Sequence, residues 1–158
     1  SRQEVWKALE RIKKEGRCLS IGVSNFAPKH LNEILINADF NPTVNQIEMS
    51  PFLHQHEISS FCKKEKIHLT GYCPLARGTR FNNPELCRVA KETNKTAAQV
   101  MIRWAIQNGH TVIPKSARPK RIEENADVFD FELGEDQMKI LDELEEGLRF
   151  CPDPLGIP

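Results

Sequence analysis

The sequence lacks several features that mark specialised classes of protein. It carries no excess charge, because 22 Lys and Arg residues balance 22 Asp and Glu residues. A balanced chain has no broad electrostatic surface for DNA, RNA or an acidic membrane, so any anion site must be local. No apolar run approaches the length of a transmembrane helix, and no signal peptide is recognisable. These absences predict a cytoplasmic protein with no nucleic-acid or membrane partner.

Metal and disulfide patterns are also missing. The odd set of five cysteines contains no Cys-x-x-Cys pair and consists of Cys18, Cys62, Cys73, Cys87 and Cys151. It therefore indicates neither a disulfide framework nor a zinc cluster, and a reducing compartment is the simplest interpretation. His54 and His56 are two residues apart, a spacing that does not place side chains together on a helix. The sequence predicts no metal site.

What the chain does contain is an alternation of helix and strand patterns, over a length sufficient for one domain. The expected helices cover residues 2–15, 55–65, 96–108 and 135–146, and others begin at Pro28, Pro84 and Pro119. The expected strands cover residues 19–23, 43–48, 68–72 and 111–114. Capping boxes at Ser1 and Thr96 support two of the helix starts. The alternation predicts an α/β fold with a parallel sheet and crossover helices.

The stretch from Thr111 to Asn125 is typical of an anion site. A short strand is followed by a turn containing Lys115 and Ser116, and Pro119 suits the first turn of a helix. Such a helix start exposes unpaired N–H groups and a partial positive charge. Lys115 adds a cation, and Arg121 adds a planar fork that can bind a phosphate with two hydrogen bonds.

The helix after this turn has two expected faces. Arg121, Glu124 and Asn125 share one face, which is available to a ligand. The expected inward face is apolar and consists of Ile122, Ala126 and Phe129. The alternative interpretation is a basic loop followed by an ordinary surface helix, on which Arg121 simply pairs with Glu124.

Polar residues stand at the carboxyl end of each expected strand, where parallel α/β folds bind ligands. They are Ser24-Asn25, Gln46-Ile47-Glu48, Tyr72 and Lys115-Ser116. Because four such positions fall at one rim, their coincidence favours a binding site over four unrelated loops.

Five motifs at these positions resemble those of the aldo-keto reductases. In order, they are Gly22-Val23-Ser24-Asn25-Phe26, Asn45-Gln46-Ile47-Glu48, Gly71-Tyr72-Cys73-Pro74-Leu75, Ile113-Pro114-Lys115-Ser116, and Arg121 with Glu124-Asn125. The resemblance runs from about residue 5 to residue 150. It implies a (β/α)8 TIM barrel and an NADPH cofactor bound without a Rossmann motif.

The resemblance also assigns cofactor contacts to individual residues. Ser24, Asn25 and Gln46 would hydrogen-bond the nicotinamide carboxamide, and Tyr72 would stack on the nicotinamide ring. The residues along the pyrophosphate would be Cys73 and Leu75. The 2′-phosphate would be held by Lys115, Ser116, the backbone of Ala117, and Arg121. The adenine would contact Glu124 and Asn125.

One part of the family pattern has no counterpart. The family's acid–base group is a tyrosine assisted by Lys, Asp and His from the first four strands. The only tyrosine of this chain, Tyr72, is in the stacking position. The resemblance therefore predicts the C-terminal half of the barrel, strands five to eight with their helices, in which residues 148–158 form a terminal loop. A complete barrel of this kind needs ~250 residues.

The expected parent protein is an NADPH-dependent reductase of small aldehydes or ketones, of which this chain would be a fragment. It would supply most of the cofactor site, be inactive alone, and require the N-terminal half of its own barrel as a partner. Two alternatives remain open at this point. One is a non-catalytic truncated isoform that acts as an NADPH-binding or interaction module, and the other is a poorly folding product without function.

Overall fold

The computed structural model describes residues 1–157, and the chain divides into two compact units. Unit 1 comprises Ser1–Ile47, Gln55–Thr70 and the described part of the C-terminal stretch from Pro152. Unit 2 comprises Glu48–His54 and Gly71–Cys151. No helix within residues 1–157 is both long and apolar enough to cross a lipid bilayer.

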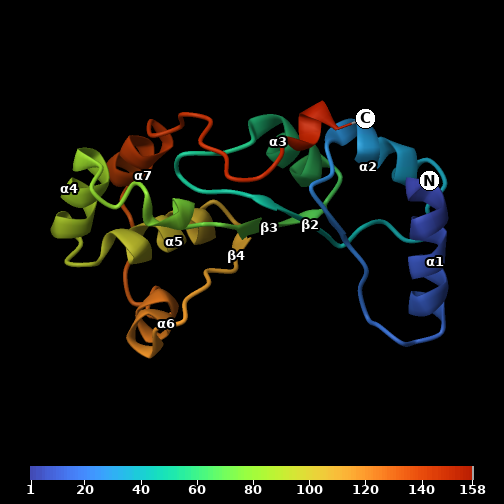
Figure 1. Cartoon of the computed structure of the whole chain (residues 1–158), viewed down its shortest axis with the longest axis horizontal. Coiled ribbons are helices and arrows are strands. Elements are labelled where there is room, and N and C mark those ends of the chain that lie inside the picture. The colour runs from blue at the N-terminus through green and yellow to red at the C-terminus, as the bar shows by residue number, and fades with distance from the viewer. Residues whose placement is uncertain (158) are drawn as a thin grey trace. The chain divides into compact units, whose positions relative to one another are not determined.

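Unit 1 contains three helices: α1 (Arg2–Lys14), α2 (Pro28–Leu35) and α3 (His56–Lys64). In this unit α1 contacts α2, and α2 contacts α3 (Figure 1). A short 3-10 helix, η2 (Pro154–Gly156), belongs to the same unit. The buried side chains of Trp6, Ile21 and Ile34 form a cluster within it. The apolar face expected for residues 2–15 consisted of Val5, Leu9 and Ile12, and it is not confirmed as a whole. Val5 is 63% exposed, and the buried residues of α1 are Trp6 and Glu10.

Unit 2 is built around α5 (Ala97–Gln107) (Figure 1). Every residue of this helix from Ala98 to Ala105 is buried. Helix α5 contacts α4 (Pro84–Glu92), α6 (Pro119–Ala126) and the strand β4 (Thr111–Val112), whereas α7 (Glu135–Asp142) contacts α4. Trp104 of α5 donates an indole hydrogen bond of 2.7 Å to Asp142. A short 3-10 helix, η1 (Ala76–Gly78), completes the unit.

The strands β1 (Val23–Ser24), β2 (Val44–Glu48), β3 (His68–Tyr72) and β4 form a sheet in the order β1-β2-β3-β4. Strand β1 is parallel to β2, with Ser24 opposite Gln46. Within unit 2, the N–H of Met49 donates to the carbonyl of Tyr72, and the N–H of Ile113 donates to the carbonyl of Gly71. These bonds confirm an α/β fold in which segments far apart in the sequence pair side by side.

Most of the predicted elements are confirmed, but several boundaries differ. The strand predicted at residues 19–23 is confined to Val23–Ser24, and Leu19 is 91% exposed. The strand predicted at residues 111–114 covers only Thr111–Val112. The last helix ends at Asp142 rather than at residue 146, because the N–H groups of Glu146 and Leu148 donate to the carbonyl of Phe52 and draw the chain away from the helix axis.

The prediction for the inward face of α6 was wrong. Ile122 is 53% exposed and Phe129 is 76% exposed, whereas Asn125 and Val128 are buried. Polar contacts to α5 orient this segment: Gln99 Nε2 donates to the carbonyl of Asp127, and Arg103 donates to that of Val128. These two hydrogen bonds, rather than the apolar periodicity of the short helix, determine which face of α6 is buried.

Candidate functional site

A cavity of about 600 Å³ lies within unit 2. Its wall comes from four segments: the loop after β3, the start of α5, the turn after β4, and one face of α6 (Figure 1). Two of these segments follow the carboxyl ends of strands. The cavity therefore lies where ligands of parallel α/β folds bind.

Seven of the predicted cofactor residues line this cavity. They are Cys73, Leu75, Lys115, Ser116, Arg121, Glu124 and Asn125. Two other predicted residues of unit 2 border the wall without forming it. Tyr72 is the last residue of β3, and Ala117 is an exposed residue of the turn after β4. The structure thus brings together residues that are separated by about fifty positions in the sequence.

The two cations of the cavity have uncompensated charge. Within residues 1–157, neither Lys115 nor Arg121 takes part in an ion pair or in a side-chain hydrogen bond, and both line the cavity. The alternative prediction, a surface pair between Arg121 and Glu124, was wrong. The Glu124 carboxylate instead accepts a hydrogen bond of 2.7 Å from the Thr96 hydroxyl. An anion would therefore find two cations that no protein carboxylate neutralises.

The turn after β4 adds hydrogen-bonding groups beside these cations. The Ser116 hydroxyl accepts a bond of 3.1 Å from the N–H of Arg118, which closes a tight turn before α6. Helix α6 begins at Pro119 without a side-chain cap. An uncapped helix start carries a partial positive charge, which favours a negatively charged ligand.

Asn125 points to a ligand independently of these charges. Its side chain is only 8% exposed, it lines the cavity, and it forms no hydrogen bond within the described part of the chain. The amide atoms are not sealed from solvent, so they can be reached by a molecule in the cavity. A bound molecule with polar edges would supply the missing hydrogen bonds.

Unit 1 assembles the remaining predicted residues. Ser24 Oγ and the N–H of Asn25 both donate to the carbonyl of Gln46, each at 2.9 Å. The Asn45 carboxamide accepts from the N–H of Phe26 and donates to its carbonyl, which holds the turn after β1 in place. Ser24 and Gln46 are thus neighbours on paired strands, and Asn25 follows directly after β1.

Backbone conformation sets two of the predicted residues apart. Asn25 and Cys73 have φ values of 56° and 51°, in the left-handed region that residues other than glycine seldom adopt. Each stands directly after a strand, where this conformation turns the chain sharply. Left-handed non-glycine residues are frequent at functional sites, because the surrounding structure must stabilise their strain.

Glu48 of the expected rim and Cys62 of α3 have structural roles instead. The buried Glu48 carboxylate accepts from the N–H groups of Phe150 and Cys151 at 2.8 and 3.0 Å, and so holds the last segment of unit 2. In unit 1, burial raises the pKa of the Cys62 thiol, and a hydrogen bond from Asn45 lowers it only in part. Cys62 therefore packs as a neutral thiol.

The cavity also contains residues that sequence reasoning did not assign to it. The main ones are Thr96, Arg77 and Phe81. Thr96 was predicted only as the cap of a helix, and that role is confirmed. Its position in the wall depends on the packing of α5 against α6, for which the sequence has no local signal.

Comparisons with known proteins show the family of the chain. The sequence model of the Aldo/keto reductase family matches residues 1–146. The chain is 43% identical over 152 residues to a glyoxal reductase of Bacillus subtilis, and it is 44% identical over 154 residues to a 9,11-endoperoxide prostaglandin H2 reductase of Trypanosoma cruzi. It superimposes with a TM-score of 0.92, at 41% identity, on a crystal structure of a Gox0644 mutant in complex with NADPH.

These matches cover nearly all of the chain but only part of each relative. The alignments span 96% of this chain in both reductases and 97% in the Gox0644 structure. They cover 55% and 54% of the two reductases and 57% of the Gox0644 chain. The chain thus spans little more than half the length of the relatives that it matches.

Proposed function

Since the chain belongs to the aldo/keto reductase family, we propose that the cavity of unit 2 binds the adenosine 2′-phosphate end of NADPH. The observation that carries this proposal is the pair of unpaired cations, Lys115 and Arg121, beside the buried and unpaired Asn125. Two cations match a phosphate dianion, and the carboxamide matches the polar edge of a base.

Each residue keeps the role that the family resemblance gives it. Lys115, Ser116 and Arg121 bind the 2′-phosphate with help from the backbone of Ala117. Glu124 and Asn125 contact the adenine. The pyrophosphate runs along Cys73 and Leu75.

The nicotinamide end is assigned in the same way. Tyr72 stacks on the ring, and the carboxamide is bound by Ser24, Asn25 and Gln46, which the pairing of β1 with β2 holds side by side. The bound cofactor supplies a hydride. The role of these residues is to orient the ring that carries it.

In a complete protein, this chain forms the C-terminal half of a (β/α)8 barrel that reduces small aldehydes or ketones to alcohols. The proton for the carbonyl oxygen then comes from a tyrosine outside these 158 residues. Because Tyr72 is the only tyrosine here and stands in the stacking position, the chain alone binds the cofactor without turnover.

The test is a double substitution, Lys115→Ala with Arg121→Ala, assayed by titrating NADPH and NADH into the chain. Each charge-assisted contact contributes about 1.5–3 kcal/mol, so the double variant loses NADPH affinity by about a hundredfold or more. Affinity for NADH, which lacks the 2′-phosphate, changes far less. Lys120→Ala is the matched control, since Lys120 is an exposed cation of α6 outside the cavity wall. An equal loss for both cofactors contradicts the assignment.

A further inference from the structure

Thr96 lies where α5 begins and has a role in the cavity beyond capping that helix. Its hydroxyl oxygen accepts a hydrogen bond of 3.2 Å from the N–H of Gln99, and the Gln99 side chain returns a bond of 3.0 Å to the N–H of Thr96. The single hydroxyl proton is left for Glu124 Oε1, at 2.7 Å. The cap therefore determines the direction in which this proton points.

This contact is the sole hydrogen bond of the Glu124 carboxylate within residues 1–157. It occupies Oε1, so Oε2 remains available in the cavity wall. Arg121 lies three residues earlier on α6, a spacing at which carboxylates and guanidinium groups commonly pair. They do not pair here, and the carboxylate is bound to Thr96 instead. The contact thus orients Glu124 and also leaves Arg121 free for an anion.

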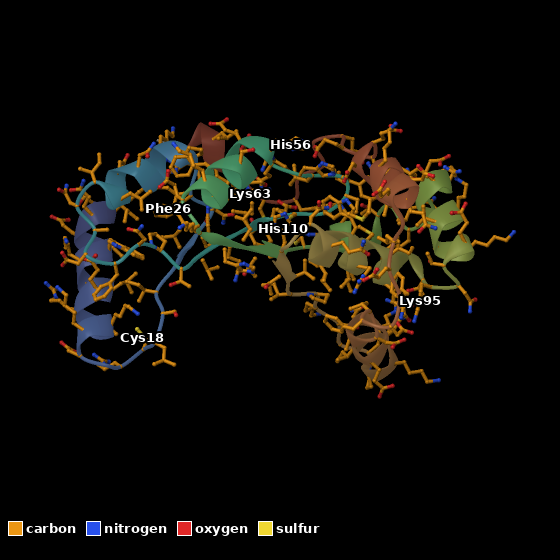
Figure 2. The ribbon with its side chains drawn as sticks, turned by 180° about the vertical axis from the view of Figure 1, so that it is seen from behind. Cys18, Phe26, His56, Lys63, Lys95 and His110 are labelled. Atoms are coloured by element: carbon orange, nitrogen blue, oxygen red, sulfur yellow. The ribbon has the colours of Figure 1, made fainter. Side chains whose placement is uncertain are left out.

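Neighbouring bonds fix the distance between Thr96 and α6. Gln99 Nε2 donates to the carbonyl of Asp127 at 2.7 Å. The Lys95 ammonium, labelled in Figure 2, donates to both carboxylate oxygens of Asp130 at 2.8 and 2.7 Å and to Asp127 at 3.3 Å. Lys95 and Gln99 flank Thr96, and Asp127 and Asp130 follow Glu124 closely in the sequence, so these bonds hold the two side chains within hydrogen-bonding distance before any ligand arrives.

We propose that Thr96 is a positioning residue that aims the Glu124 carboxylate at the exocyclic amino group of the base, so that the cavity selects adenine over hypoxanthine. This proposal rests on the nucleotide site proposed above. An ionised carboxylate only accepts hydrogen bonds. The adenine N6 group donates two, whereas the O6 atom of hypoxanthine is an acceptor and would face the carboxylate with like polarity.

The experiment compares two probes, adenosine 2′,5′-bisphosphate and inosine 2′,5′-bisphosphate, by calorimetric titration of the chain at neutral pH. The wild-type chain is expected to prefer the adenosine probe by about 10–100-fold, the effect of one hydrogen bond to a charged group. In Thr96→Val this preference falls to about threefold or less. In Thr96→Ser, which keeps the hydroxyl, the preference stays within about threefold of the wild-type value.

Two further variants separate positioning from stability. Asn83→Ala removes the cap of α4 in the same unit, outside the cavity wall, so it lowers stability while the adenine preference stays unchanged. Thr96→Asp retains an oxygen that can cap α5 but has no proton for Glu124. The Thr96→Asp chain is expected to lose the preference for the adenosine probe. It therefore tests the proposal if Thr96→Val does not fold.

The outcomes distinguish this proposal from the proposed nucleotide site on which it rests. If the wild-type chain binds neither probe, the nucleotide site itself is wrong, and this inference falls with it. If the wild-type chain binds both probes equally, the nucleotide site stands and the reading of the base by Glu124 is refuted. An adenine preference that survives in both Thr96→Val and Thr96→Asp overturns the role of Thr96 alone.

Discussion

At the scale of single residues, three glutamates show that the role of a carboxylate depends on its surroundings. Glu48 is buried and accepts from two backbone N–H groups of the last segment of unit 2. Glu10 is buried in unit 1, where its Oε1 accepts from the N–H groups of Asp39 and Phe40. Glu124 has one partner, a hydroxyl, and lies in a cavity wall. Only the last retains an oxygen for a ligand.

Glu10 carries a prediction about pH. Burial raises the pKa of this carboxyl, but hydrogen bonds from the N–H of Phe40, from Lys7 and from the N–H of Asp39 outweigh burial and leave the pKa below its usual value of 4.5. A carboxyl whose pKa is lower in the folded state than in the unfolded state stabilises the fold at pH values above its unfolded-state pKa. This stabilisation is lost as the pH falls through the folded-state pKa. Urea unfolding of the wild-type chain should therefore show stability declining below about pH 4.5.

Substitution tests this assignment directly. Glu10→Gln, which removes the charge, should cost about 1–3 kcal/mol at pH 7 and flatten the acid limb of the stability curve. Glu33→Gln is the control, because Glu33 pairs with Arg2 on the exposed surface and exposed pairs contribute little. Parallel acid limbs in wild type and Glu10→Gln would assign the acid sensitivity to other carboxyls.

At the scale of elements, the close approach of strands depends on a glycine. The motif from Gly22 to Phe26 begins with a residue whose Cα faces the backbone of Val44. A Cβ added at Gly22 would stand 2.7 Å from the carbonyl oxygen of Val44, a distance that requires the backbone to move. The pairing that places Ser24 beside Gln46 therefore requires a residue without a side chain two positions earlier.

Gly22→Ala should accordingly destabilise unit 1 by about 1–3 kcal/mol, the range of overpacked sites, and loosen the pairing of β1 with β2. Hydrogen exchange at the N–H of Asn25, which bonds to Gln46, should become faster. Gly156→Ala is the matched control, because a Cβ there meets no atom within 4 Å. Unchanged exchange at Asn25 in Gly22→Ala would show that the strands tolerate the extra methyl group.

At the scale of the whole molecule, the balance of 22 basic and 22 acidic residues means that attraction for anions is local. Binding to polyanions depends on many cations acting together, whereas a phosphate needs only a few well-placed ones. Lys115 and Arg121 are such a local pair.

Chromatography distinguishes these two kinds of anion binding. At roughly 150 mM salt, a heparin column should not retain the chain. A chain without net charge gains no binding free energy from the release of counterions from heparin. An adenosine 2′,5′-bisphosphate resin should retain it, and free adenosine 2′,5′-bisphosphate should elute it. Retention on heparin at this salt concentration would indicate a basic surface that the composition does not reveal.

Several features of this protein could be predicted from its sequence alone. The order of helices and strands, the capping boxes at Ser1 and Thr96, and the polar residues at strand ends follow from periodicity, proline positions and capping chemistry. These signals act over a few residues and need no knowledge of the packing. The five motifs identified the family for the same reason, since each is a short local pattern. The stacking role of Tyr72 stays a prediction.

Only the tertiary structure decided which side chains line the same cavity, and which of them are paired, buried or exposed. Thr96 and Glu124 are 28 residues apart, and their hydrogen bond exists because α5 packs against α6. The same packing leaves Arg121 unpaired, buries Asn125 and exposes Ile122, against the apolar periodicity of the helix. A helix of eight residues has too little apolar surface to choose its own buried face, so contacts from distant residues choose it.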